Sequence, residues 1–70
     1  MESRYQLAVA FHESGRHSQA LDQCFQMIKK NKHWKEDAAR KLCLSIFETL
    51  GPKEDIVKEG RRKLSNLWFI

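Results

Sequence analysis

The chain has 70 residues, of which 41% are hydrophobic, and its 13 Lys and Arg against 9 Asp and Glu give a formal net charge of +4. This length suits one small domain, expected over residues 1–70, with a stability of about 3–5 kcal/mol. No run approaches the ~20 apolar residues of a membrane-spanning helix, and the start, Met1 to Arg4, lacks the apolar segment of a secretory signal. We therefore expect a cytoplasmic protein of a reducing compartment, without membrane association.

The first predicted helix covers residues 2–14. Its apolar positions recur every three or four residues, which is the period of a helix with one buried face. They are Tyr5, Leu7, Ala8 and Phe11, with Val9 as a further candidate. Gly15 ends this helix, because glycine takes the left-handed C-cap conformation without a steric clash.

The second predicted helix runs from His17 to Asn31. Its broad apolar face is formed by Ala20, Leu21, Cys24, Phe25, Met27 and Ile28. Lys29 and Lys30 lie in its last turn, where positive charge suits the negative end of the helix macrodipole. Because the link to the first helix is very short, the two helices must fold back as an antiparallel hairpin over residues 2–31.

A third helix is predicted after a polar connector that contains Trp34. We expect Trp34 to anchor the connector against the first hairpin, although an exposed aromatic binding residue is the alternative. The helix starts near Glu36 or Asp37 and continues to Leu50, where Gly51-Pro52 forms a firm stop. Its apolar positions are Ala39, Leu42, Cys43, Ile46, Phe47 and Leu50.

The fourth predicted helix begins after Pro52 and completes a second hairpin over residues 36–69. Its buried side consists of Ile56, Val57, Gly60, Leu64, Leu67 and Trp68. Gly60 costs about 1 kcal/mol relative to Ala inside a helix, which we explain by the close approach of another helix. The apolar end, Leu67 to Ile70, either folds back on the core or docks on a neighbour.

The side chains that carry most enzyme chemistry form no recognisable set. His12, His17 and His33 lack the i, i+4 spacing of a helical metal site, and no nucleophile with a matching base stands out. Cys24 and Cys43 lie in apolar segments, so we expect two reduced core thiols; the alternative, a disulfide, needs an oxidising compartment. We therefore expect no enzyme activity, no bound metal and no cofactor.

The densest basic cluster is Arg61, Arg62 and Lys63. Such a cluster can pair with phosphates, but Glu59 lies within the same helix and can pair with Lys63 at i, i+4. We therefore favour a helix that faces solvent or a protein partner and do not expect nucleic acid. The alternative function is a basic helical structural subunit that contacts RNA or a large assembly.

The two halves of the chain echo each other. Each consists of a helix, a glycine-containing break and a second helix, and Gly15 and Gly51 are 36 positions apart. With these glycines aligned, Phe11 matches Phe47, and we expect both rings in the core. A period of this length made of helix pairs is typical of a helical solenoid. We therefore predict an all-α fold of four helices in two tandem antiparallel hairpins.

The first half resembles a tetratricopeptide repeat. The family's motif alternates large and small residues at fixed positions, and five residues of this chain fit it. They are Leu7, Ala8, Phe11, Gly15 and Ala20. The resemblance implies a right-handed solenoid fragment in which the first helix of each pair lines a concave, protein-binding side.

A narrower resemblance covers about residues 6–69. It is carried by Leu7-Ala8, Gly15-Arg16, Gln19-Ala20-Leu21, Ala39-Arg40-Lys41, Ile46 to Gly51, and Arg61-Arg62-Lys63-Leu64-Ser65. In these segments the chain resembles the C-terminal repeat region of bacterial YbbN-type proteins, which carry a thioredoxin-like domain before the helical repeats. Such proteins are described as co-chaperones or holdases. The resemblance therefore implies a non-enzymatic domain that binds a client polypeptide or a chaperone.

The partner-binding residues expected from these patterns lie on three helices. They are Tyr5, Gln6, Val9, His12 and Glu13 on the first, Lys41 on the third, and Arg61, Arg62 and Trp68 on the fourth. A surface that mixes aromatic, aliphatic and charged side chains suits an extended or helical peptide. Alternatively, Tyr5 and Val9 pack on a neighbouring repeat, and stacking on further repeats or a homo-oligomer stays open.

Overall fold

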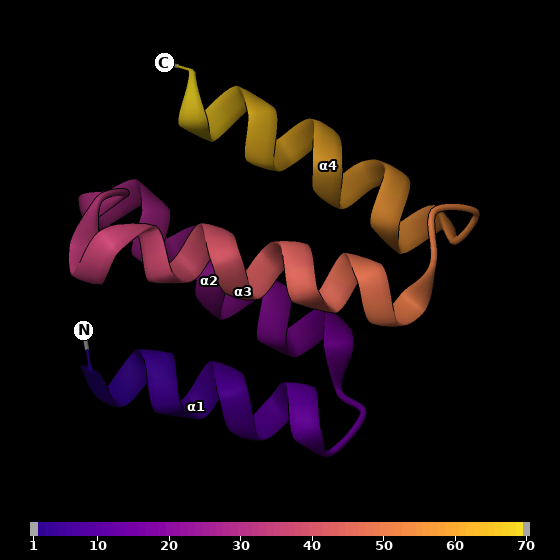
Figure 1. Cartoon of the computed structure of the whole chain (residues 1–70), viewed down its shortest axis with the longest axis horizontal. Coiled ribbons are helices and arrows are strands. Elements are labelled where there is room, and N and C mark those ends of the chain that lie inside the picture. Colours follow the sequence, from indigo (N-terminus) through magenta and orange to yellow (C-terminus); the bar gives the residue numbers. More distant parts are fainter. Residues whose placement is uncertain (1, 70) are drawn as a thin grey trace.

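Four helices joined by short turns make up the fold (Figure 1). A computed structural model describes residues 2–69, so Met1 and Ile70, the ends of the expected domain, lie outside the described residues. The helices are α1 (Glu2–Glu13), α2 (His17–Asn31), α3 (Trp34–Leu50) and α4 (Asp55–Trp68). The predicted all-α fold of two tandem antiparallel hairpins is confirmed. No helix within residues 2–69 is long and apolar enough to cross a membrane.

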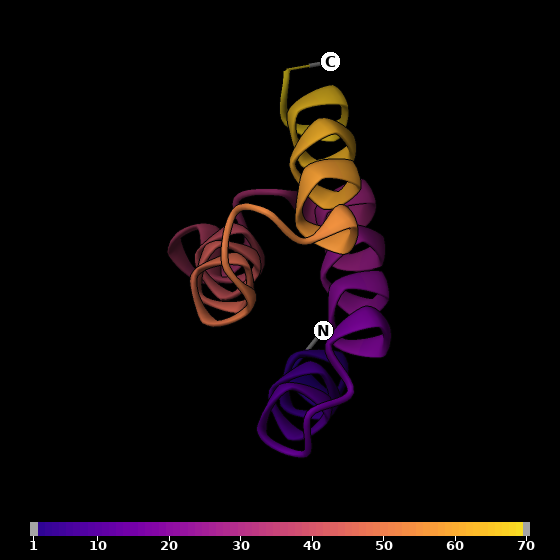
Figure 2. The ribbon, with the colours of Figure 1, turned by 90° about the vertical axis from the view of Figure 1, so that its right-hand side faces the viewer.

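Helix α2 is the centre of this arrangement. Seen in Figure 2, α1, α2 and α4 form one layer, and α3 packs beside α2 on one side of it. The apolar face predicted for α2 is buried along its whole length. Its buried residues are Ala20, Leu21, Cys24, Phe25, Met27 and Ile28. One helix therefore supplies the surface on which the other three are assembled.

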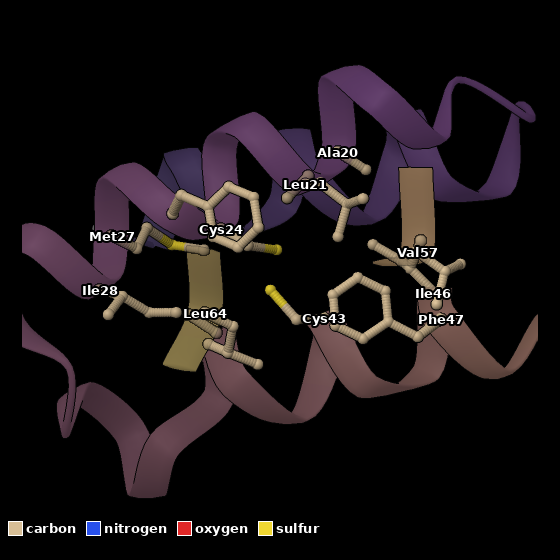
Figure 3. Packing of buried hydrophobic residues seen from close by; sticks show 13 residues of the cluster. Ala20, Leu21, Cys24, Met27, Ile28, Cys43, Ile46, Phe47, Val57 and Leu64 are labelled. Carbon is tan, nitrogen blue, oxygen red and sulfur yellow. The ribbon is translucent and has the colours of Figure 1, made fainter. Parts of the chain in front are cut away.

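The remaining core side chains come mainly from α3 and α4. Figure 3 shows Cys43, Ile46 and Phe47 of α3 facing α2, with Val57 and Leu64 of α4 beside them. Trp34 packs against the edge of this core, which confirms that the connector is anchored.

Helix α1 contributes less to the core than its apolar stripe predicted. Ala8 is its one buried residue within the described range, and Phe11 is half-buried. The expectation that Leu7 shares the buried stripe is wrong, since 44% of Leu7 is exposed. The reason is that α1 packs almost entirely on α2, so only a narrow strip centred on Ala8 is covered.

The turn of the first hairpin is closed by a glycine C-cap. Gly15 has φ +82°, the Arg16 N–H donates to the Phe11 carbonyl over 2.7 Å, and the Gly15 N–H donates to the His12 carbonyl over 3.2 Å. These two bonds form a Schellman motif, which satisfies carbonyls that the helix end leaves without partners. The predicted role of Gly15 is confirmed.

The connector between α2 and α3 has an unexpected backbone conformation. Lys35, Glu36 and Asp37 have φ values of 52°, 57° and 63°, so the right-handed part of α3 begins at Ala38 and not at Glu36 or Asp37. Left-handed backbone costs non-glycine residues about 1–2 kcal/mol each. Side-chain contacts offset part of this cost, among them the 3.1 Å pair of Lys35 with Glu2.

The predicted close approach at Gly60 is present. A Cβ atom at this position would lie 2.7 Å from Cε1 and 2.9 Å from Cζ of Phe47, which is closer than real Cβ contacts allow. Gly60 is itself buried, and its neighbour Phe47 is 1% exposed. The glycine thus allows α4 to approach the aromatic side chain that α3 places in the core.

Replacing Gly60 by alanine tests this contact. Gly60→Ala should lower the free energy of unfolding by about 1–3 kcal/mol through overpacking, although alanine gains about 1 kcal/mol in helix propensity. In a Phe47→Leu background, which removes the clashing ring atoms, the same substitution should be neutral or stabilising. Urea unfolding of the four proteins measures both effects, and a stabilising Gly60→Ala in the unmodified chain would contradict the packing.

The core position of Phe47 leads to a second prediction. Phe47→Ala should cost about 3–5 kcal/mol of unfolding free energy, because it leaves a cavity at the centre of the cluster. Phe69→Ala is the matched control, since Phe69 is 80% exposed and its loss should stay within about 0.5 kcal/mol. Unfolding in guanidinium chloride measures both free energies. Equal losses in Phe47→Ala and Phe69→Ala would show that Phe47 is wrongly assigned to the core.

Candidate functional site

The start of α1, the α2–α3 connector and the end of α4 lie at the same end of the molecule (Figure 1). Aromatic and cationic side chains from these three segments contact one another there. On the α1 side, the rings of Tyr5 and Trp34 lie 5.7 Å apart in a tilted arrangement. The Lys35 ammonium lies 5.8 Å from the Tyr5 ring and 5.6 Å from the Trp34 ring. Tyr5, one of the expected binding residues, is thus packed against the connector.

On the α4 side of the same end, Trp68 is held by three residues. The Lys32 Nζ donates a 2.6 Å hydrogen bond to the Trp68 carbonyl and lies 5.6 Å from its ring. The His33 ring meets the indole edge-on at 5.4 Å, and the Arg40 guanidinium lies 5.1 Å from it. The last carbonyl groups of a helix have no partner within that helix, and a lysine side chain that reaches them can donate the missing hydrogen bond. Lys32, which follows α2, does this for the last turn of α4. The connector therefore fixes both the end of α4 and the indole.

A small cleft opens between α3 and α4 next to Trp68. Its volume is about 150 Å³. The lining residues are Arg40, Leu44, Arg61, Leu64, Ser65, Trp68 and Phe69, and we call this site the α3–α4 cleft. Leu44 is 39% exposed and Phe69 is 80% exposed, so the cleft has an apolar rim that faces solvent.

The α3–α4 cleft carries positive charge from both helices. Arg40 stands on α3 over Trp68, and Arg61 stands on α4 with its guanidinium 5.6 Å from the Phe47 ring. Within residues 2–69 the ion pairs are His33–Asp37 and Lys35–Glu2, so neither arginine has a carboxylate within 4.0 Å. Two guanidinium groups thus flank an apolar opening without an acidic partner in the described part of the chain.

A larger groove of about 560 Å³ lies on the other side, between α2 and α4. Phe11, Leu21 and Phe25 line its apolar part, whereas Asp22, Glu59 and Lys63 bring charges of both signs to it. Because these two acids and one base leave a smaller net charge than the two arginines of the α3–α4 cleft, this groove offers less discrimination by charge.

The residues expected to bind a partner do not form one surface. Arg61 and Trp68 share the α3–α4 cleft, while Lys41 and Arg62 are exposed on the same two helices outside its lining. On α1, Gln6 and Glu13 are exposed and Val9 is half-buried. The His12 side chain lies at the turn of the first hairpin, where its Nδ1 is 3.4 Å from the Nδ1 of His17.

Sequence reasoning missed Arg40 and Leu44 as members of this site, and it named Phe69 only as part of the apolar end that folds back on the core or docks on a neighbour. Arg40 and Leu44 are four residues apart, which places them on one helix face, so the pairing on α3 was accessible from spacing. Lys32 and Trp68 are 36 positions apart in the sequence, so no pattern of neighbouring residues predicts their contact.

These features define a class of protein. Tandem helix hairpins that bury one continuous core and leave open, side-chain-lined surfaces are helical-repeat scaffolds, which are suited to holding other polypeptides. A family model described as tetratricopeptide repeat matches residues 1–69. The chain therefore belongs to the tetratricopeptide-repeat family, whose domains generally mediate protein–protein interaction and are typically non-catalytic. Searches of curated proteins and of solved structures found no match.

The bond between Lys32 and the Trp68 carbonyl can be tested directly. Lys32→Met keeps most of the aliphatic stem but removes the donor, and should lower the free energy of unfolding by about 1.5–3 kcal/mol, as expected for a hydrogen bond to a charged group. Lys30→Met is the matched control, because Lys30 is exposed in the last turn of α2. Urea unfolding followed by tryptophan fluorescence measures the free energy of unfolding of both variants. An equal loss in Lys32→Met and Lys30→Met would argue against the hydrogen bond.

Proposed function

We propose that the α3–α4 cleft binds a polypeptide segment that combines acidic residues with one large apolar side chain. The observation that carries this proposal is the pair of arginines, Arg40 and Arg61, which flank the cleft without carboxylate partners among residues 2–69. Complementary charge favours an acidic partner over a neutral or basic one. The exposed side chains of Leu44 and Phe69 add apolar surface for the same partner.

The size of the cleft supports a peptide over a small molecule. Pockets for drug-sized ligands usually measure about 300–1,000 Å³, whereas this cleft measures about 150 Å³. Such a space accepts one side chain of a partner, while the rest of the segment lies over α3 and α4. Lys41 and Arg62, exposed on these helices, extend the positive surface that such a segment would follow.

Stacking prepares both arginines for carboxylates. A guanidinium that rests on an aromatic ring keeps its N–H donors in the plane of the fork, where they can meet a carboxylate in bidentate geometry. Arg40 rests on Trp68 and Arg61 on Phe47, at 5.1 and 5.6 Å. Because the rings already restrict these side chains, binding loses less conformational entropy than it would with free arginines.

The co-chaperone part of the proposal rests on the resemblance to YbbN-type repeat regions. Two of the segments that carry it, Ala39-Arg40-Lys41 and Arg61 to Ser65, supply both arginines of the cleft. We therefore propose that the domain works in the cytoplasm as the binding part of a co-chaperone-like protein. Its partner is then a client polypeptide or a chaperone with an acidic, apolar segment.

Peptide binding with charge reversal tests the proposal. The probe is a fluorescein-labelled peptide in which Asp and Glu flank a single Trp, compared with a peptide of the same length in which Lys replaces the acids. The acidic peptide should bind, and Arg40→Glu and Arg61→Glu should each weaken it at least about tenfold, as expected when a charged hydrogen-bonded pair is lost. Fluorescence anisotropy measures the affinities. Arg16→Glu is the matched control, because Arg16 is exposed at the first hairpin turn.

Four results would overturn this function. Equal binding of the two peptides would remove the charge argument, and an equal loss with Arg16→Glu would show that net charge alone matters. Self-association in sedimentation that Phe69→Ser abolishes would assign the cleft to a second copy or a further repeat. Tight binding of single-stranded RNA, falling steeply with salt and lost in Arg61→Glu, would favour the basic structural subunit.

A further inference from the structure

Two thiols meet in the middle of the core. Cys24 projects from α2 and Cys43 from α3, both are fully buried, and Figure 3 shows their sulfur atoms pointing toward one another across the interface. A hydrogen bond with Cys24, burial, and the nearby charge of an ionised Cys24 raise the pKa of the Cys43 thiol above its usual range. The protein thus places two buried thiols side by side at the point where its two hairpins join.

We propose that Cys24 and Cys43 are a redox-modification site, at which a low-molecular-weight disulfide such as oxidised glutathione converts the thiol pair into a disulfide between α2 and α3. The argument is geometric: the two cysteines come from facing helices, are fully buried, and point their sulfur atoms at one another (Figure 3). The site is separate from the α3–α4 cleft and does not depend on the proposed function.

The exchange proceeds in two steps that balance. When the α2–α3 interface opens, the thiolate of one cysteine attacks a sulfur of oxidised glutathione, which forms a mixed disulfide and releases one glutathione. The thiolate of the second cysteine then attacks the cysteine sulfur of the mixed disulfide and releases a second glutathione. The two protons of the protein thiols end on the two glutathione thiolates, so the protein loses two electrons and two protons, and glutathione gains them.

Burial makes this reaction depend on opening of the fold. Only thiolates attack disulfides, and the raised pKa of Cys43 keeps its thiol protonated while the core is closed. The glutathione of the mixed disulfide also needs space that the closed core does not provide. The reduced pair is therefore stable in a reducing compartment, and oxidation occurs only when the oxidant persists through many openings.

The new bond would tie the first hairpin to the second. It joins α2 to α3 and closes a loop that contains the left-handed residues of the connector, Lys35, Glu36 and Asp37. A cross-link of this kind removes conformations from the unfolded chain and so raises the melting temperature of the folded one. Oxidation would therefore fix the relative position of the two hairpins.

The test uses the whole chain in a buffer of oxidised glutathione, with alkylation of free thiols after denaturation. Mass spectrometry should show the loss of two hydrogens, with no glutathione attached and no alkylated cysteine. The melting temperature should rise by roughly 10–20 °C and return to its former value with dithiothreitol. In Cys24→Ala and Cys43→Ala, each compared with and without oxidant, no such rise should occur.

Three results would overturn the proposal. The first is that both thiols remain free in the folded chain under conditions that oxidise the urea-unfolded chain. The second is that the product keeps glutathione on one or both cysteines. The third is that the disulfide forms but leaves the melting temperature unchanged or lowers it, which would show that the native arrangement does not fit the cross-link.

Discussion

The contact between the Phe47 ring and the backbone of Gly60 is the constraint on which the second hairpin depends. Because Gly60 has no side chain, α4 lies against this ring, and Val57 and Leu64, one turn away on either side, reach the core. The guanidinium of Arg61 also stacks on the Phe47 ring, at 5.6 Å from the ring centre. One aromatic side chain therefore sets the packing of α4 and positions one wall of the α3–α4 cleft.

The interior and the surface have separate roles in this molecule. Among residues 2–69 no polar or charged side chain is buried, so the core supplies stability and shape but no directional recognition. The polar and charged side chains of the described residues therefore lie at the surface, among them those of the connector and of the outer faces of α3 and α4. With a net stability of only about 3–5 kcal/mol expected at this size, contacts such as Lys32 with Trp68 are a substantial part of what holds α4 in place.

Local sequence features determined most of the fold, whereas the cleft depends on distant contacts. The helices, the Gly15 cap and the close approach at Gly60 were predictable, because periodicity and backbone conformation are properties of neighbouring residues. The exposure of Leu7 depends on which helices happen to cover α1. The left-handed backbone at Lys35 to Asp37 could not be predicted, because the segment contains no glycine. Lys32 and Arg40 surround Trp68 only because α4 ends beside the connector, which no local pattern encodes.

The position of the two arginines has a further consequence for stability. Arg40 belongs to α3 and Arg61 to α4, so an acidic segment that contacts both guanidinium groups bridges the two helices of the second hairpin. Such a segment binds only when α3 and α4 are packed, because unfolding separates the two positive charges and exposes the apolar cleft. A ligand that binds only the folded state stabilises it in proportion to the logarithm of its concentration over its dissociation constant. Under the proposed function, the second hairpin is held by its own core contact at Gly60 when the cleft is empty and additionally by the acidic segment when one is bound.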